Sequence, residues 1–279
     1  MNDKLLQHLE SAVQTSGDIP YLRRLILDMA VRGQLLPQNK ADESIEVLLN
    51  KIAAEKQKVE KNQSRRVRKT SQSVGKDDAP FPLPKNWKWV QLQDIGNIFS
   101  GNSINEDVKQ DKYTNIKGGI PYIGTKDVGY GWDALNYENG VSIPQEEPKF
   151  VTAYKGAVLM CFEGGSSGKK CGIADRKICF GNKLVAVQPY GGIAPDFILS
   201  VYQTSMFGML FSNKTKGERG GISIKKFESL MIPLSSLVEQ KRIVAQVKPL
   251  MLLCNKLEMS MDDLQEKRHQ FLKTLSPTI

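Results

Sequence analysis

A short stretch rich in glycine and lysine, residues 163–170, combines residue types that contact phosphate groups in proteins. Its spacing excludes a nucleotide-binding P-loop, which has four residues between its glycines and a Ser or Thr after the lysine. Here three residues separate Gly164 from Gly168, and Lys169 is followed by Lys170. Successive glycine and serine amides beside two lysines still form a cationic, sterically open turn. We expect this turn to contact phosphate; the alternative is a plain hairpin connection between strands 157–162 and 171–174.

The sequence lacks the residue patterns of the common enzyme and metal sites. Its two histidines, His8 and His269, stand near opposite ends of the chain, and no G-x-G-x-x-G segment is present to bind a dinucleotide or a methyl-donor cofactor. The four cysteines form no C-x-x-C pair, so no zinc site of usual spacing is expected. We therefore predict a non-catalytic chain with no cofactor or metal of its own and with reduced, mostly buried thiols.

The charge balance points to a polyanionic partner. The chain of 279 residues has a formal net charge of +9 at pH 7 and 40% hydrophobic residues, enough for a packed core. No run approaches the roughly 18 apolar residues that span a bilayer, and the charged N-terminus does not resemble a secretory signal. Nucleic acid is the expected partner and the cytoplasm the expected location; a basic surface kept for solubility is the alternative.

Residues 1–60 have the apolar spacing of amphipathic helices and predict an N-terminal helical region. The middle helix is expected to begin near Asp18 and Pro20 and to end at Gly33. The third is expected to begin at about Ser44. The apolar positions of the three helices are Leu5, Leu6 and Leu9, then Leu22, Leu25, Ile26 and Met29, then Ile45, Leu48, Leu49 and Ile52.

The rest of the chain predicts an α+β fold with a β-rich domain and a long C-terminal helix. Residues 61–82 have the composition of a basic linker, which either lies along phosphates or is a solvated tether. Residues 83–233 form the β-rich domain, and residues 234–279 the helix. Short apolar runs predict the strands, and one helical stretch, at about 195–212, interrupts them. The predicted strands are 89–92, 120–123, 157–162, 184–187 and 230–232.

The C-terminal helix has a capped start and a heptad pattern. Ser236 followed by Glu239 is a capping-box pattern. Pro249 predicts a kink or a restart, because proline removes one helical hydrogen bond. The apolar spacing of 4 and 3 is typical of a coiled-coil interface with another subunit; the alternative is packing on the chain's own core. The seam consists of Ile243, Val247, Leu250, Cys254, Leu257, Met261, Leu264 and Phe271, with Arg268 as its polar member.

Four motifs occur in an order and spacing that resemble a known family. They are LPKNWKWVQL (83–92), GIPYIGTKDV (119–128), GGISIKKF (220–227) and IPLSSLVEQKRIV (232–244). Together they are similar to the target-recognition domain and the following conserved helix of type I restriction–modification specificity subunits. The N-terminal segment 21–38 also resembles that family, as though the repeat that begins at the C-terminus continued at the N-terminus.

The resemblance implies a non-catalytic DNA-binding chain in a restriction–modification complex. The domain would recognise one half of a split target, and the helix would act as spacer and docking site for a methyltransferase subunit. S-adenosylmethionine would be bound by that partner, a restriction subunit could join, and two copies could pair through the C-terminal helix. The family's usual chain has two recognition domains and this sequence has one, so it is either a half-length subunit or part of a longer chain. A coiled-coil scaffold with incidental DNA binding is the alternative function.

Residue type and loop position select candidate DNA contacts in the β-rich domain. Asn182 is the strongest candidate for a base contact, because its amide can bond bidentately to adenine. Asp127 is expected to be structural, as an Asx-turn or cap residue. The complete set is Lys126, Tyr130, Lys169, Lys170, Asn182, Lys183, Lys214, Lys216, Arg219 and Lys225.

Overall fold

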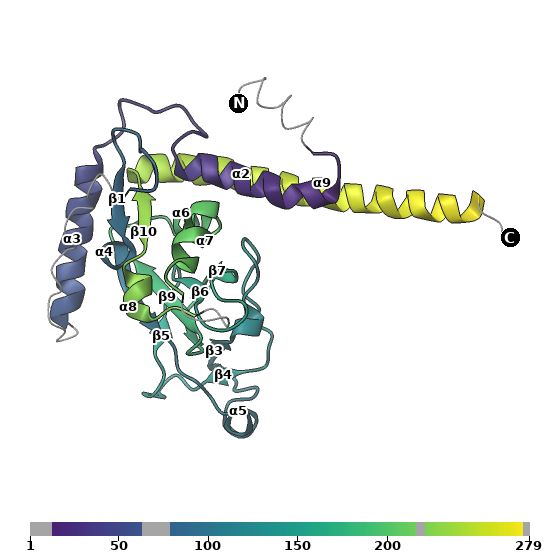
Figure 1. Cartoon of the computed structure of the whole chain (residues 1–279). Coiled ribbons are helices and arrows are strands. Elements are labelled where there is room, and N and C mark those ends of the chain that lie inside the picture. The colour runs from purple at the N-terminus through teal and green to yellow at the C-terminus, as the bar shows by residue number, and fades with distance from the viewer. Residues whose placement is uncertain (1–12, 63–78, 216–220, 276–279) are drawn as a thin grey trace.

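A β-rich domain lies below the long helix α9 (Leu237–Leu275) and the shorter helix α2 (Ile19–Val31) beside it (Figure 1). The computed structural model describes residues 13–62, 79–215 and 221–275. Helices α2 and α9 lie side by side across the top, and α3 (Ile45–Asn62) runs along one flank of the domain. The predicted α+β class, with N-terminal helices and a long C-terminal helix, is confirmed. The four domain boundaries stay a prediction.

The N-terminal helices begin and end close to the expected residues. A 3-10 turn, η1 (Ser16–Asp18), leads into α2, which has Pro20 in its first turn, and Gly33 follows the helix with φ +67°. The expected apolar face of α3 is confirmed for Ile45, Leu48 and Ile52, which are buried. That of α2 is partly wrong: Leu25 is 45% exposed, whereas Leu27, Ala30 and Val31 are buried. The first predicted helix, with Leu5, Leu6 and Leu9, lies outside the described residues.

Three small sheets form the β-rich domain. Strand β1 (Lys88–Gln91) pairs antiparallel with β10 (Met231–Leu234), so the first and last strands of the domain lie side by side. A second sheet has the order β2-β9-β6-β7, and a third has the order β4-β3-β8-β5. Their bounds are β2 Gly96–Ser100, β3 Ile120–Ile123, β4 Ser142–Ile143, β5 Thr152–Ala153, β6 Val158–Cys161, β7 Cys171–Ile173, β8 Ile178–Phe180 and β9 Leu184–Pro189.

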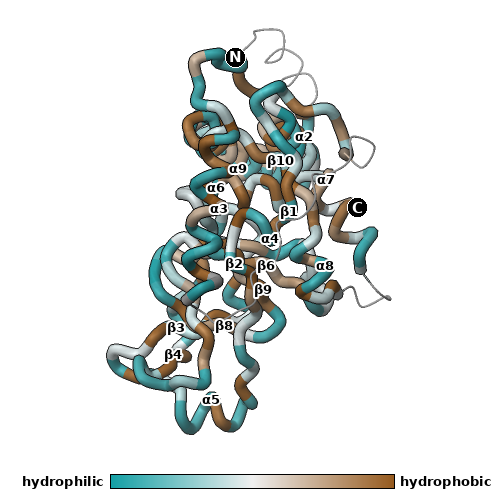
Figure 2. Tube along the Cα trace, turned by 90° about the vertical axis from the view of Figure 1, so that its left-hand side faces the viewer, coloured by the Kyte–Doolittle hydropathy of each residue, from teal (hydrophilic) through white to brown (hydrophobic). Residues whose placement is uncertain are grey.

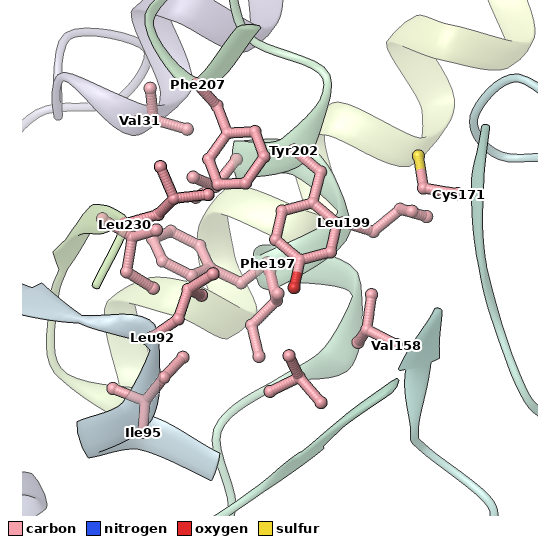
Figure 3. Packing of buried hydrophobic residues seen from close by; sticks show 14 of the residues in the cluster. Val31, Leu92, Ile95, Val158, Cys171, Phe197, Leu199, Tyr202, Phe207 and Leu230 are labelled. Carbon is pink, nitrogen blue, oxygen red and sulfur yellow. The ribbon is translucent and has the colours of Figure 1, made fainter. Parts of the chain in front are cut away.

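Two largely buried strands and two helices build the main core. Strands β6 and β9 lie in the hydrophobic centre of the domain (Figure 2). The predicted helical stretch 195–212 is two helices, α6 (Pro195–Tyr202) and α7 (Ser205–Ser212), because Thr204 caps α7 by accepting from the Phe207 amide. Phe197, Tyr202 and Phe207 pack beside Leu92 and Ile95 of the short helix α4 (Leu92–Ile95; Figure 3). The remaining short elements are α5 (Glu106–Lys112), η3 (Thr125–Asp127) and α8 (Ile224–Glu228).

Helix α9 is one unbroken helix of 39 residues, so the restart predicted at Pro249 is wrong. Pro249 lies on the exposed side of the helix. Helix α2 runs antiparallel to α9: Arg23, near the start of α2, contacts Glu258 at 2.6 Å, and Asp42, beyond its end, forms a bidentate pair with Arg242. These contacts join the N-terminal segment to the part of α9 between Arg242 and Glu258 within the same chain.

A buried carboxylate fixes the start of α9. Ser236 accepts from the Glu239 amide, as predicted, but the Glu239 side chain does not return to the cap. It is 3% exposed and accepts from Trp87 Nε1 at 2.9 Å and from Gln38 Nε2 at 2.6 Å. Gln240 is also buried and accepts from the Ala194 amide. The polar residues at the start of α9 therefore connect this helix to its own chain.

Candidate functional site

Several loops lie at one edge of the β-rich domain, because the strands before them end there. Strands β3 and β8 are parallel, with Ile123 opposite Phe180, so both carboxyl ends reach the same edge. Strand β6 ends beside the start of β9, with Cys161 opposite Leu184. Residues 124–130, 162–170 and 181–183 follow these strand ends. We call these three segments together the loop edge.

Backbone hydrogen bonds join the three segments. The Gly181 amide donates to the Ile123 carbonyl at 2.9 Å, and the Phe162 amide donates to the Lys183 carbonyl at 3.1 Å. On the other side of the same loop, the Ile222 amide donates to the Phe162 carbonyl at 3.0 Å. Loops from both four-stranded sheets are therefore held against one another, and their side chains share one surface.

Lys170 is fixed within this edge by two contacts. Its ammonium donates to the Thr125 carbonyl at 3.2 Å and lies 5.3 Å from the centre of the Tyr130 ring. The segment carrying Tyr130 is itself held by the Cys171 amide, which donates to the Gly129 carbonyl. The Tyr130 side chain nevertheless remains 65% exposed. An ammonium held over an aromatic ring has less freedom than a solvated lysine, so its positive charge has a defined place on the surface.

Four further predicted contact residues are exposed at the loop edge: Lys126, Lys169, Asn182 and Lys183. In the described part of the chain, their side chains take part in no hydrogen bond or ion pair. The pKa of Glu106, a neighbour in α5, is lowered mainly by its hydrogen bond with Lys109 and also by the charge of Lys126. The edge therefore combines four lysines with an exposed amide that can both donate and accept.

The turn between β6 and β7 requires glycine. Gly168 has φ +71°, and a Cβ there would lie 2.7 Å from the Phe211 ring. Gly164 has φ +85°, and a Cβ at Gly164 or Gly165 would meet nothing within 4 Å. The hairpin connection of strands β6 and β7 is confirmed. Contact with phosphate stays a prediction, and the open backbone at the two glycines is compatible with it.

The remaining predicted DNA-contact residues lie in or beside the segment before α8. Lys214 is partly buried: its ammonium donates to Ser229 Oγ at 2.6 Å, and burial, helped by Lys226, lowers its pKa. The structure thus gives Lys214 an internal bonding role at the base of the segment. Lys225 is exposed on α8. Lys216 and Arg219 lie outside the described residues.

One residue beside this edge, Asn102, was not foreseen from the sequence. Asn102 follows β2; its amide donates to the Phe180 carbonyl, and its side chain accepts from the Val151 amide at 2.8 Å. Asn102 follows Gly101, where an added Cβ would lie 1.9 Å from the Phe180 carbonyl oxygen. The backbones of Gly101 and Phe180 therefore approach each other closely. Asp127 is buried and accepts from the Gly124 amide, which confirms its predicted structural role.

The predicted coiled-coil seam of α9 divides into two parts. Ile243, Val247 and Cys254 are buried in the chain's own core, so they are not available to another subunit, which corrects that part of the prediction. The cover is intramolecular because α2 and α6 pack along this half of the helix. Leu250, Leu257 and Met261 are partly buried against the same core. Leu264 and Phe271 are 65% and 62% exposed, as the free end of a seam would be.

The described residues offer little nucleophilic or metal chemistry. All four cysteines are free and buried, and burial raises the pKa of the Cys171 thiol to about 12. No group of three or more His, Cys, Asp or Glu in the described ranges is placed to hold a metal ion. Within those ranges no helix is long and apolar enough to cross a membrane.

The match to a protein family covers both the loop edge and the first part of α9. Residues 84–261 match the family model described as the type I restriction modification DNA specificity domain. The chain belongs to this family. The match to the specificity domain begins next to Trp87 and β1 and ends on α9, so it includes the complete β-rich domain and the helix half that packs on it.

The relatives of this specificity domain are longer proteins. The specificity subunits of the type I restriction enzymes EcoAI and EcoEI from Escherichia coli are each 26% identical to this chain, over 276 and 272 residues. The matches cover 91% and 94% of this chain, and 44% of each relative. The chain thus spans less than half the length of the curated relatives it matches.

A solved structure supports the same fold. It comes from a study of complex assembly and conformational transition of the type I R-M system, and it is similar with a TM-score of 0.54 and 20% identity. The match covers 81% of this chain and 52% of that one. At this identity the likeness concerns the fold, in which a β-rich domain is joined to long helices.

Proposed function

We propose that this chain is the DNA-recognition component of a type I restriction–modification complex and recognises one half of a split target. One observation carries the proposal: the domain that matches the DNA specificity family presents four lysines and a free amide on one edge. Lysines there would position the duplex through its phosphates, and the amide would contact base edges. Asn182 is suited to adenine, because it has one donor and one acceptor side by side.

Helix α9 would link this recognition domain to other subunits. Its 39 residues extend about 58 Å at 1.5 Å per residue, which exceeds the roughly 34 Å of one DNA turn. Its far end exposes Met259, Leu264, Phe271 and Leu272, an apolar surface that the described part of the chain leaves uncovered. We propose that this end contacts a methyltransferase subunit or pairs with a second copy, so that two recognition domains are held more than one turn apart. A restriction subunit would join through the methyltransferase.

The chemistry of such a complex would belong to the partner subunits. This chain would bind DNA and orient it in the cytoplasm, and S-adenosylmethionine would be bound by the methyltransferase. The buried thiols, with raised pKa values, are poor nucleophiles and agree with a non-catalytic role.

Two measurements on the full chain test this function. Binding to duplex DNA should weaken steeply with salt, since each phosphate contact releases a counterion. Affinity purification from cells that produce the protein should recover a methyltransferase subunit. Absence of duplex binding at low salt together with absence of that subunit would overturn the proposal. Recovery of protein partners without any DNA binding would favour the scaffold alternative.

A further inference from the structure

Glu163 is the exposed acidic residue of the loop edge, whose other acidic residue, Asp127, is buried. It opens the turn between β6 and β7, and its side chain is exposed. Its neighbour Phe162 is hydrogen-bonded to the Lys183 carbonyl, so Glu163 lies between that lysine and the loop that ends in Lys169 and Lys170. A negative charge at this place opposes the approach of phosphates.

The Glu163 carboxylate has no evident structural task. In the ranges that the structure describes, it accepts no hydrogen bond and forms no ion pair, although its backbone carbonyl accepts from the Cys161 thiol. Glu106 provides the contrast, because its carboxylate lies 2.6 Å from Lys109 Nζ and is used within α5. The backbone after Glu163 is open, since a Cβ at Gly164 or Gly165 would meet nothing within 4 Å. A ligand can therefore approach this side chain from the side of Gly164 and Gly165, whereas on another side a Cβ at Gly221 would lie 3.9 Å from Glu163 Cγ.

Only one base has a major-groove edge that is complementary to a carboxylate. Cytosine presents its amino group, a donor, with no acceptor at its major-groove edge. Adenine adds the N7 acceptor beside its amino group, and guanine and thymine present acceptors that repel a carboxylate. Electrostatic repulsion from phosphates is therefore offset for Glu163 only when the side chain accepts from cytosine.

We propose that Glu163 determines specificity by accepting a hydrogen bond from the amino group of one cytosine in the target. This inference rests on the proposed DNA-recognition function and assigns one residue to one base. The lysines around it bind every sequence alike, whereas Glu163 favours a single base pair and weakens binding to all duplexes that lack it.

Selection from a randomised duplex library by the full-length protein tests the assignment. Glu163→Ala should lose a 5- to 100-fold preference for cytosine at one position, the range that a good base contact provides. The same variant should bind random duplex more tightly, because one phosphate-repelling charge is gone. Glu163→Gln should move the preference at that position from cytosine towards adenine, since an amide matches the adenine edge. Glu146→Gln is the matched control: it is exposed beyond β4, away from the loop edge, and should leave all preferences unchanged.

The outcomes separate this inference from the function on which it rests. If the wild-type protein enriches no sequence, the proposed DNA-recognition function fails. If it enriches a target and Glu163→Ala enriches the same one with equal preference at every position, the assignment of Glu163 is overturned. Equal weakening of all sequences by Glu163→Ala, with a lower melting temperature, would also overturn it, because that result indicates a structural role.

Discussion

Replacing Glu239 with alanine should destabilise the chain and loosen the connection of α9 to the β-rich domain. The carboxylate accepts from Trp87 at the start of the domain and from Gln38 in the N-terminal segment, at 2.9 and 2.6 Å. Three parts of the chain that lie far apart in sequence therefore meet at one side chain. Alanine would remove both acceptors and leave the buried indole N–H of Trp87 without a partner.

The expected loss of stability follows from the two hydrogen bonds and from the burial of the Glu239 carboxylate. Bonds to a charged acceptor contribute about 1.5–3 kcal/mol each, so about 3–6 kcal/mol is lost. Burial of the carboxylate, which raises its pKa, offsets part of this. We expect a net decrease of about 2–4 kcal/mol in the free energy of unfolding. Urea unfolding followed by tryptophan fluorescence measures it directly, because Trp87 is one of the partners.

Glu146→Ala, at an exposed carboxylate, should change the free energy of unfolding by less than about 0.5 kcal/mol. If Glu239→Ala changes the free energy of unfolding by no more than this control, Glu239 does not hold the three segments together. The start of α9 is then not fixed by this carboxylate.

Two further predictions concern the pH dependence of stability and the two halves of the α9 seam. Burial raises the pKa of Glu239 above its ordinary value of 4.5, so ionisation of this carboxyl costs more in the folded chain than in the unfolded chain. Wild-type stability relative to Glu239→Gln should therefore be highest below pH 4.5 and should fall as pH rises through the folded pKa. Chemical unfolding of both proteins between pH 4 and 8 checks this, and a difference that grows with pH would contradict it. Ile243→Asp should cost about 3 kcal/mol or more, because it buries a charge, whereas Leu264→Asp should change stability by less than about 0.5 kcal/mol. If two copies pair through α9 as proposed, analytical ultracentrifugation should show that Leu264→Asp removes this pairing while the chain stays folded. Equal destabilisation by the two variants would refute the division of the seam.

Elements with a strong local signal could be predicted from the sequence. Residues 120–123 form the expected strand, because two β-branched residues and a tyrosine follow a glycine turn. Helix α2 starts and ends as Pro20 and Gly33 indicate. Lys126 and Lys183, which the sequence selected by residue type and loop position, come to one edge because β3 and β8 are parallel.

Features that depend on tertiary partners could not be predicted. The heptad pattern of α9 shows that an apolar stripe must be covered, but not that the core of the same chain covers Ile243 and Val247. A capping box predicts that Glu239 returns to its helix start, whereas a buried indole 152 residues away in sequence competes for the carboxylate. Lys214 has the same residue type as Lys169, and only the position of Ser229 makes it internal.

The most direct test of the central claim is the salt dependence of duplex binding in two matched triple variants of the full chain. Lys126, Lys169 and Lys183 are exposed at the loop edge, and Lys117, Lys155 and Lys177 are exposed at the opposite end of the same strands. Both alanine triples lower the net charge by three. If the loop edge binds DNA, the first triple should reduce the slope of log affinity against log salt by roughly 2–3, while the second should leave it nearly unchanged. Equal reductions in both triples would show that net charge alone attracts DNA and would contradict the account.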